Sequence, residues 1–415
     1  MKLYRLLFVP VAALLMGCTE DNPFEGEDYK DAAPMIHSGD VVLVTNRNVE
    51  KFLTEVTYED KDWSYTRIYD YYGGFNRVKY NENGVPDENG TVVKTPKSDK
   101  PERYSIRWLK NAEAGELTLT LEEPTLKQEI HLNAGACYAD ITNLVPNTNY
   151  NYKVTYNTSG EVAAEGSFST TGHLHQVFFQ SGCRNGRDLG GWKTLDGKTV
   201  KYHKIYRGGR MQVETVNLYG KEEIISEGIG AQLDLRGTDD VLSKPTVEGF
   251  DFCAPVIEQG GVAMLNDVNE SGINKTRQCF EFVLQSIKAG KGVYYHCSLG
   301  RDRTGTLTVV LLGLLGVPEH DISKEYEVTY FAPLGYSCSS SEKESSYDKE
   351  AGGWLFQNNR TKWVYSEIAP YFWQMADKTE SKTFAAGVEK YLLEVAGVSK
   401  QDIDDFRALM LEDKK

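Results

Sequence analysis

The sequence lacks the features that would place it in several common protein classes. Its 415 residues include only seven cysteines, none in a Cys-x-x-Cys pair, which argues against a disulfide framework and against a zinc site. Acidic residues outnumber basic ones by 60 to 46, and the formal net charge of −14 argues against a nucleic-acid partner. A local cationic pocket for an anionic ligand is still compatible with this charge. The first apolar run, Leu6 to Met16, is too short to span a bilayer as a stable helix.

The first 36 residues have the pattern of a targeting segment followed by a tether. Lys2 and Arg5 precede the apolar run, which ends in Leu15-Met16-Gly17-Cys18. This ending resembles a bacterial lipoprotein cleavage box. The resemblance implies a signal peptide over 1–17, lipid attachment at Cys18 and a membrane-anchored place in the bacterial cell envelope, either periplasmic or surface-exposed. A plain secretory signal is the alternative. Residues 18–36 are polar and predict a flexible tether.

Residues 37–172 predict an all-β domain. Residues 104–108 and 117–121 alternate between apolar and polar side chains, as half-buried strands do. The segment Leu144 to Val154 resembles the tyrosine corner of fibronectin type III-like sandwiches, which implies a fibronectin III- or immunoglobulin-like fold. The tyrosine-rich stretch Asp60 to Pro101 predicts an insertion or an extra hairpin. Its tyrosines could bind carbohydrate or protein, or could simply lie on the surface of a spacer domain.

Residues 173–415 predict an α/β domain with a central, mostly parallel sheet flanked by helices. Its key stretch is a short apolar strand, Val293 to Tyr295, then the loop 296–305, then an apolar helix over 306–315. A strand, a tight glycine-containing loop and a helix N-terminus together form an anion site. We call residues 297–303 the signature loop.

The signature loop contains the groups that a thiol-based phosphoryl transfer needs. Cys297 at its start can be a thiolate nucleophile, because helix N-termini and nearby cations lower a thiol pKa. Arg303 can return across the loop and bind two phosphate oxygens with its planar fork. Gly300 allows the turn, and the Thr304 hydroxyl could stabilise the sulfur. The alternative is a buried structural cysteine beside an ordinary charged turn. Cys183 does not match this spacing and is expected to be structural.

The loop resembles the His-Cys-x5-Arg-Ser/Thr phosphate loop of the cysteine-dependent phosphatases. Several spaced motifs are similar to one group of these, the bacterial atypical tyrosine and dual-specificity phosphatases, some of which also act on phosphoinositides. Two features depart from that group: Arg301 stands where many members have lysine, and a polar segment, Gly335 to Gly353, predicts a mobile loop. The matching motifs lie at 185–191, 206–207, 234–236, 296–305, 314–322, 325–329 and 398–407.

The resemblance implies roles for individual residues. Cys297 would form a cysteinyl-phosphate, Arg303 would bind the phosphoryl group, and Asp302 would be the general acid and later the base. No tryptophan-proline-aspartate trio supplies an acid elsewhere, so Asp234 and Asp239 are the reserves. No metal or organic cofactor is expected. The expected phosphate-binding set is Ser298, Leu299, Gly300, Arg301, Arg303 and Thr304. The expected supporting set is His296, Arg187, Asp188, Arg207, Asp234 and Arg236, which could line the pocket or form structural ion pairs.

These patterns predict a phosphatase that hydrolyses phosphomonoesters of a phosphorylated protein or a small phosphoester, with phosphotyrosine or dual specificity. A phosphoinositide or inositol polyphosphate phosphatase is the alternative within enzymes. The non-enzymatic alternatives are a phospholigand-binding protein and an adhesion lipoprotein led by the β-domain.

Overall fold

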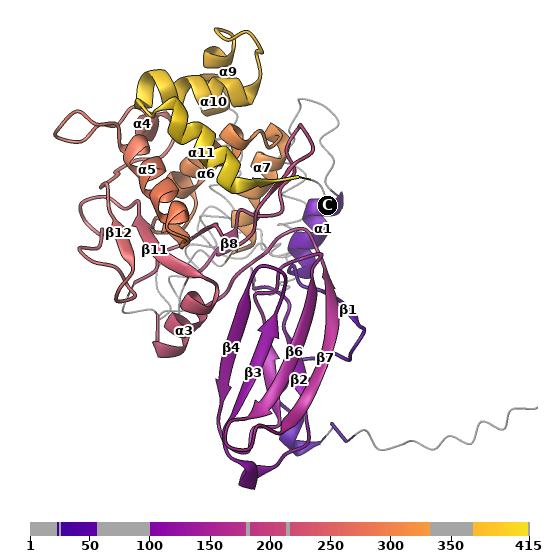
Figure 1. Cartoon of the computed structure of the whole chain (residues 1–415). Coiled ribbons are helices and arrows are strands. Elements are labelled where there is room, and N and C mark those ends of the chain that lie inside the picture. The colour runs from indigo at the N-terminus through magenta and orange to yellow at the C-terminus, as the bar shows by residue number, and fades with distance from the viewer. Residues whose placement is uncertain are drawn as a thin grey trace, which may run out of the picture.

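The computed structural model describes residues 23–24, 26–55, 100–179, 183–212, 216–332 and 368–413. The predicted signal peptide and Cys18, most of the 60–101 insertion and the 335–353 segment lie outside these residues. The described chain forms two lobes, a lower one built of long strands and an upper one that contains most of the helices (Figure 1). No helix in the described ranges has both the length and the apolar character needed to cross a membrane.

The N-terminal lobe is built on a five-stranded sheet in the order β1-β7-β6-β3-β4. Strand β1 runs parallel to β7, and the other neighbours are antiparallel. The inward side chains of alternating strands, such as Leu119, Val154 and Phe168, form its core with Trp108. The strands are β1 (Val41–Leu43), β3 (Leu117–Glu122), β4 (Lys127–Leu132), β6 (Asn149–Tyr156) and β7 (Val162–Thr171), with a separate pair β2 (Tyr104–Arg107) and β5 (Tyr138–Ile141).

The contact expected of a tyrosine corner is present at the start of β6. The backbone N–H of Val145 donates to the Tyr150 hydroxyl at 2.8 Å. The Tyr150 ring is buried and stacks on Phe168 with ring centroids 5.2 Å apart. This bond secures the chain as it enters β6, because it satisfies a buried backbone donor that precedes the strand.

The prediction of an all-β segment over 37–172 is wrong for one element, the helix α1 (Arg47–Glu55). The Asn46 side chain caps it by accepting from the N–H of Asn48 at 3.0 Å. Val49, Phe52 and Leu53 lie on one face at helical spacing and are buried in the core of the other lobe. The helix therefore forms because a face with period 3.6 finds its hydrophobic partner in the C-terminal lobe.

The C-terminal lobe contains the expected mostly parallel sheet, in the order β12-β11-β13-β10-β8. Only β8 is antiparallel to its neighbour. Helices α5 (Lys275–Lys288) and α6 (Asp302–Leu315) pack against this sheet, and every residue of α6 from Thr304 onward is buried. The strands are β8 (Arg187–Asp188), β10 (Ile205–Gly208), β11 (Ile229–Asp234), β12 (Asp251–Cys253) and β13 (Gly292–His296), with a two-stranded pair β9 (Thr199–Val200) and β14 (Leu411–Glu412).

Two consecutive helical segments near the C-terminus, 384–396 and 400–410, end and begin at residues suited to those positions. Gly397 closes the first helix at a left-handed φ of 77°, and the Ser399 hydroxyl caps the second by accepting from the N–H of Asp402. The last turn of the first helix is a π-helix. The helices not yet named are α3 (Leu218–Ser226), α4 (Val262–Leu265), α7 (Glu319–Glu327), α9 (Ala369–Ala376), α10 (Phe384–Tyr391), the π-turn η7 (Leu392–Ala396) and α11 (Lys400–Met410), with 3-10 turns η1 (Glu27–Tyr29), η2 (Ala112–Ala114) and η3 (Val328–Phe331).

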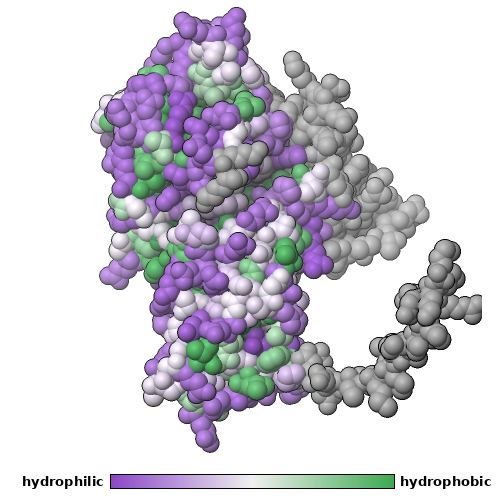
Figure 2. All heavy atoms as spheres, turned by 45° about the vertical axis from the view of Figure 1, so that its right-hand side comes forward, coloured by the Kyte–Doolittle hydropathy of each residue, from purple (hydrophilic) through white to green (hydrophobic). Residues whose placement is uncertain are grey.

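The buried apolar side chains of the described residues form three clusters, one in the N-terminal lobe and two in the C-terminal lobe, of which the largest also includes α1. On the face shown in Figure 2, hydrophilic residues predominate over both lobes, and hydrophobic ones form small separate patches. The two lobes are joined at the linker that follows β7. There α1 and the neighbouring strand ends of the N-terminal lobe contact the C-terminal lobe (Figure 1).

Candidate active site

The signature loop lies at the carboxyl ends of parallel strands, where open α/β sheets place their ligands. It connects β13, a central strand, to the N-terminus of α6. Gly300 has a left-handed φ of 70°, and a Cβ there would lie 2.3 Å from the backbone carbon of Gly208. Only glycine fits this contact between the loop and the end of β10.

Cys297 is buried at the base of the loop with 3% of its surface exposed. Burial by itself raises a thiol pKa, but the Arg303 charge and hydrogen bonds from Thr304 outweigh it, so the pKa of Cys297 lies below its usual value. The Thr304 hydroxyl is itself buried and has no nitrogen or oxygen partner in the described part of the chain. In contrast, burial raises the pKa of Cys183 to about 12, as expected for a structural thiol.

Arg303 is partly buried, and its position is fixed from the side of β12. Its Nη1 donates to the carbonyl of Ile257 at 2.9 Å. One end of the guanidinium is thus held by the backbone, while its charge acts on the Cys297 sulfur. The Arg303 charge is therefore held close enough to stabilise the Cys297 thiolate before any anion arrives.

Asp302 begins α6 and is engaged by the residue before it. Arg301 approaches its carboxylate with Nε at 3.2 Å from Oδ1 and with Nη2 at 3.1 Å from Oδ2. The Tyr326 hydroxyl donates to Oδ1 at 3.4 Å. The Asp302 side chain is 34% exposed, whereas that of Arg301 is 6% exposed. The Arg301 side chain therefore pairs with Asp302, although both were expected to face the substrate.

His296 is fully buried and neutral. Its Nε2 accepts from the Gln232 side-chain amide at 2.9 Å, and its Nδ1 lies 3.3 Å from the Cys297 carbonyl. Burial, which the Asp234 charge opposes and the Arg236 charge reinforces, lowers the pKa of His296 to about 4. His296 therefore orients the backbone at the start of the loop and carries no charge to the thiol.

Arg187 and Arg207 brace the loop from behind and do not line a pocket. Both are buried, and they share the Glu325 carboxylate of α7, at 2.6 Å and 2.9 Å respectively. Arg207 also donates to the carbonyl of Gly300, and the Asn185 side chain donates to the same carbonyl at 2.9 Å. Four buried polar side chains therefore fix the backbone at the tip of the signature loop.

Asp234 and Arg236 form a second buried pair beneath the loop. Arg236 Nη2 lies 2.8 Å from Asp234 Oδ2. Burial opposes ionisation of Asp234, but the charge of His296 when protonated and the contacts with Arg236 outweigh it, so the pKa of Asp234 is lowered. Asp239, the other reserve acid, is exposed. The residue that reaches the loop from this segment is Asp240, whose carboxylate accepts from the Ser298 hydroxyl at 2.7 Å.

The sequence pattern of the tyrosine phosphatase family matches residues 180–412, which is more than half of the chain. The chain belongs to the tyrosine phosphatase family. A Cupriavidus necator protein assigned as a tyrosine-protein phosphatase is 27% identical over 173 residues, 37% of this chain. The chain spans 62% of the length of that curated relative.

Solved structures of phosphatases are similar to part of the chain. The core catalytic domain of the PP-IP phosphatase SIW14 from S. cerevisiae, in complex with citrate, is 17% identical, with 39% of this chain and 90% of that chain covered and a TM-score of 0.23. PTPMT1 in complex with PI(5)P is 16% identical, with 36% and 92% covered and a TM-score of 0.21. At these scores neither structure supports an inference about the chemistry of this tyrosine phosphatase family member.

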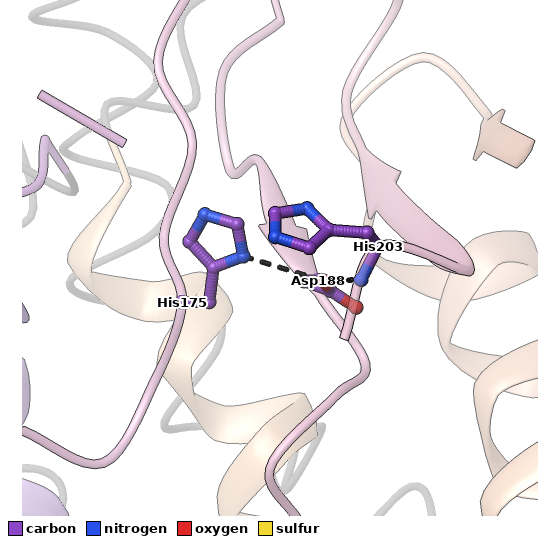
Figure 3. A group of neighbouring side chains, drawn as sticks. All are labelled: His175, Asp188 and His203. Atoms are coloured by element: carbon purple, nitrogen blue, oxygen red, sulfur yellow. Dashed lines mark hydrogen bonds and ion pairs between the residues drawn. The ribbon is translucent and has the colours of Figure 1, made fainter. Parts of the chain in front are cut away.

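Asp188 alone among the expected supporting residues lies away from the loop of this phosphatase-family domain. It contacts His175 and His203 on the side of β8 that faces the N-terminal lobe (Figure 3). By spacing alone, these three side chains could hold a metal ion, and among the described residues they are one such group. Their hydrogen bonds, described below, already occupy the ligand atoms of His175 and Asp188.

Sequence reasoning missed the residues that hold the loop in place. Glu325 belongs to the motif at 325–329, for which the family resemblance implies no individual roles, and Asn185 opens the motif at 185–191. Two buried arginines, in the short strands β8 and β10, need an acceptor, so an acidic residue of another element was the available signal. Nothing in the sequence indicated that Asp240 contacts the signature loop, except that it follows Asp234 by six residues.

Proposed function

We propose that this protein hydrolyses phosphomonoesters, with phosphotyrosine or dual specificity, through a cysteinyl-phosphate intermediate. The observation that carries the proposal is a buried cysteine with a lowered pKa, at a helix N-terminus, beside an arginine held by a backbone carbonyl. This combination offers a nucleophile and an anion site in the same loop.

In the first step the Cys297 thiolate attacks phosphorus, the S–P bond forms and the P–O ester bond breaks. The backbone N–H groups of the signature loop and the Arg303 guanidinium stabilise the charge on the equatorial oxygens. The leaving oxygen takes a proton from a carboxylic acid, for which we propose Asp302. In the second step water attacks phosphorus, returns its proton to that carboxylate and releases inorganic phosphate and the thiolate.

The proposal is tested on the purified full chain with a substrate panel. The panel contains an aryl phosphate, phosphotyrosine and phosphoserine peptides, a phosphoinositide and an inositol polyphosphate. We expect Cys297→Ser to abolish turnover of every substrate while retaining affinity for phosphate, because the loop N–H groups and Arg303 remain. Retained turnover in Cys297→Ser would exclude the covalent mechanism, and activity on inositol lipids alone would favour the alternative substrate class.

The acid assignment has its own test. Protonating the leaving oxygen is worth about 10²–10⁴-fold in rate, and a phenoxide leaves largely unaided whereas an alkoxide does not. Asp302→Asn should therefore reduce kcat strongly for an alkyl phosphate and weakly for an aryl phosphate. Asp240→Asn is the matched comparison, because Asp240 also contacts the loop. If Asp240→Asn shows the leaving-group dependence and Asp302→Asn does not, the acid comes from the segment after β11.

We further propose that residues 1–17 are a signal peptide and that residues 18–36 tether the protein, through lipidated Cys18, to a membrane of the bacterial cell envelope. The cleavage-box pattern supports this. Cys18→Ala should move the protein from the membrane fraction to the soluble fraction of cells that express it. Unchanged membrane fractionation would contradict the lipid anchor.

We also propose that residues 37–172 are a fibronectin III-like sandwich domain with an insertion and that 173–415 are the catalytic domain. The two sheets and the Val145–Tyr150 bond support the first assignment. Helix α1 is the exception within 37–172, since its apolar face belongs to the core of the second domain.

A further inference from the structure

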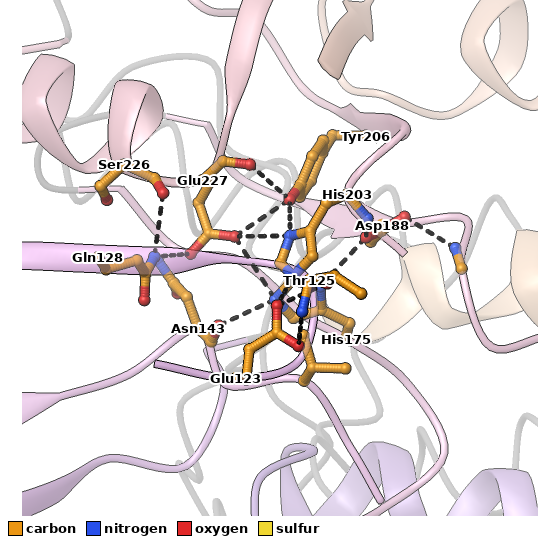
Figure 4. Close-up of polar contacts among 12 residues, drawn as sticks. Glu123, Thr125, Gln128, Asn143, His175, Asp188, His203, Tyr206, Ser226 and Glu227 are labelled. Atoms are coloured by element: carbon orange, nitrogen blue, oxygen red, sulfur yellow. Dashed lines mark hydrogen bonds and ion pairs between the residues drawn. The ribbon is translucent and has the colours of Figure 1, made fainter. Parts of the chain in front are cut away.

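A cluster of buried charged and polar side chains joins the two lobes, with His175 at its centre (Figure 4). His175 lies in the linker after β7. Its ring nitrogen Nδ1 is 3.2 Å from Asp188 Oδ2, and its Nε2 is 2.9 Å from the carbonyl oxygen of Asn143. A carboxylate and a carbonyl can only accept, so both nitrogens must donate and the ring is an imidazolium.

The surroundings of His175 are consistent with this charge. Burial disfavours the charged ring, but the hydrogen bond to Asp188 and the charges of Glu227 and Asp188 outweigh it, so the pKa of His175 lies above its usual value. Glu227 Oε2 is 3.7 Å from Nε2. The titratable groups that face the ring, directly or through His203, are Asp188, Glu227, His203, Tyr202, Tyr206 and Glu123.

Both ring nitrogens of His175 and both carboxylate oxygens of Asp188 already take part in hydrogen bonds. Asp188 Oδ1 accepts from the N–H of Gly190 at 2.8 Å, and Oδ2 accepts from the N–H of His203 at 2.6 Å as well as from His175. Binding a cation would require His175 to lose a proton and these donors to be displaced. The described geometry therefore fits a hydrogen-bonded cluster better than a metal centre. We call this cluster the His175 clasp; its members are His175, Asp188, His203, Tyr206, Glu227, Glu123, Gln128 and the Asn143 carbonyl.

The N-terminal lobe contributes directly to this clasp. Gln128 of β4 donates to the Glu227 carboxylate at 3.1 Å and to the Ser226 carbonyl at 3.3 Å. Glu123, just after β3, lies 3.2 Å from Nε2 of His203. Together with the Asn143 carbonyl, these contacts join the β3–β4 hairpin and the segment after β5 to the C-terminal lobe.

Strands β8 and β10 have the clasp on one face. On the other face they have the group that holds the signature loop, Arg187, Arg207, Asn185 and Glu325, which we call the loop brace. Their register pairs Asp188 with Tyr206 and Arg187 with Arg207. Because successive side chains of a strand point to opposite faces, the first pair faces His175 and Glu227, while the second pair faces Glu325 and the signature loop. A shift of this two-strand ribbon would therefore move the loop brace directly.

Helix α1 makes a second connection to the same brace. Its Phe52 ring packs on Phe331 of η3, with centroids 5.5 Å apart, and the Lys324 ammonium donates to the Leu53 carbonyl at 3.0 Å. Lys324 precedes Glu325 in α7, and Phe331 follows Thr329, whose hydroxyl accepts from Asn185 at 3.1 Å. The N-terminal lobe thus reaches both partners of the brace, β8 and α7.

We propose that the N-terminal lobe is a positioning element for the signature loop, docked by the buried His175 clasp and by α1, so that turnover requires the two lobes to be joined. The residues of the clasp are positioning residues, since none contacts the thiol. This inference rests on the proposed phosphatase function only for its activity readout.

The test compares His175→Gln with His173→Gln in the full chain. His173 lies in the same linker and also pairs with a carboxylate, Glu50 at 2.6 Å, but it is 57% exposed and does not touch β8. Two experiments are made. The first measures kcat and KM for an aryl phosphate. The second measures the pH dependence of Cys297 alkylation by iodoacetamide, followed by mass spectrometry of the peptide that contains Cys297.

We expect His175→Gln to reduce kcat by about 10- to 100-fold, since small displacements of a catalytic loop have effects of this size. The alkylation midpoint of Cys297 should move to higher pH, because a displaced loop stabilises the thiolate less well. His173→Gln should remain close to the wild type, because it removes only a partly exposed pair with Glu50 of α1 and leaves the buried α1 residues Val49, Phe52 and Leu53 in place. If His175→Gln lowers only the melting temperature, with kcat and the alkylation midpoint unchanged, His175 is merely structural and the proposal is wrong.

Gln128→Ala provides a milder disturbance if His175→Gln does not fold, and it should shift the alkylation midpoint in the same direction; no shift would contradict the proposal. One divalent metal ion per chain that survives dialysis and is lost in His175→Gln, measured by plasma mass spectrometry, would also overturn it. A wild type that hydrolyses no phosphomonoester would refute the proposed function, whereas the alkylation comparison would still report on the loop.

Discussion

Two fully buried histidines in this chain differ in charge, one neutral and one positive, although burial disfavours the charged form of both. His296, before the signature loop, accepts from the Gln232 amide and is neutral, with a pKa of about 4. His175, between the lobes, faces a carboxylate and a carbonyl and is a cation with a raised pKa. The partners, and not the depth of burial, decide the charge.

The difference follows from where each site needs positive charge. Near the thiol, cations already come from Arg303, Arg236 and Arg210, and each added charge would have to be desolvated. Between the lobes, the buried Asp188 carboxylate and the Asn143 carbonyl each accept from one ring nitrogen of His175, and the buried Glu227 carboxylate lies 3.7 Å from Nε2. A charged imidazole supplies both donors and neutralises part of that charge.

Among the predictions, the largest loss of stability should come from Glu325→Gln, which removes the carboxylate shared by the two arginines behind the signature loop. The pKa of Arg187 is lowered to about 10, mainly by burial and then by the charge of Arg207. The Glu325 carboxylate, which both arginines share, opposes this shift. Removing that carboxylate leaves two buried guanidinium groups uncompensated, which should cost about 3–5 kcal/mol of unfolding free energy. Urea denaturation measures the change.

The matched control for Glu325→Gln is Asp404→Asn, which breaks an exposed Lys400–Asp404 pair on α11. Surface pairs of this kind contribute about 0–1 kcal/mol. Equal losses in the two variants would mean that the buried pair of arginines does not depend on Glu325.

His296 should make the protein sensitive to acid. Its folded-state pKa lies below its unfolded value, so only the unfolded state gains a proton as pH falls from about 6.5. Stability should fall between about pH 6.5 and 4, by on the order of 3 kcal/mol, and His296→Gln should remove this dependence. Chemical denaturation at a series of pH values tests this, and an unchanged slope in the variant would mean that His296 is charged in the folded protein.

The signature loop was predictable because its information is local. Cys297, Gly300 and Arg303 fall within seven residues, between an apolar strand and an apolar helix, and the structure has β13, the tight turn and α6 there. Ser399 and Gly397 were predictable as helix ends for the same reason, since a cap bonds residues two or three positions away.

The rest depends on contacts that sequence periodicity does not contain. Arg187 meets Glu325 across 138 positions, and His175 meets Asn143 across 32. The two-residue strand β8 is too short to show alternation, so its sequence could not reveal that Arg187 and Asp188 face different sites. Helix α1 was missed because its partner, the core of the other lobe, lies far along the chain.

The smallest expected effect is the loss of the His175 charge in the wild type as pH rises above about 6.5. His175 has a folded-state pKa above its unfolded value, so its contribution to stability is fully present below about pH 6.5 and is lost as pH rises through the folded-state pKa. Deprotonation leaves one of its two acceptors, Asp188 or the Asn143 carbonyl, without a donor, and one such bond is worth about 0.5–1.5 kcal/mol. Stability measured by urea denaturation should therefore decline slightly across this range in the wild type and in His173→Gln, but not in His175→Gln.

A ¹⁵N-labelled histidine spectrum assigns the charge directly: at pH 7 both ring nitrogens of His175 should carry protons, whereas one nitrogen of His296 should carry none. A neutral His175 at pH 7 would contradict the clasp, because one of its two acceptors would then lack a donor and the contrast between the two histidines would disappear.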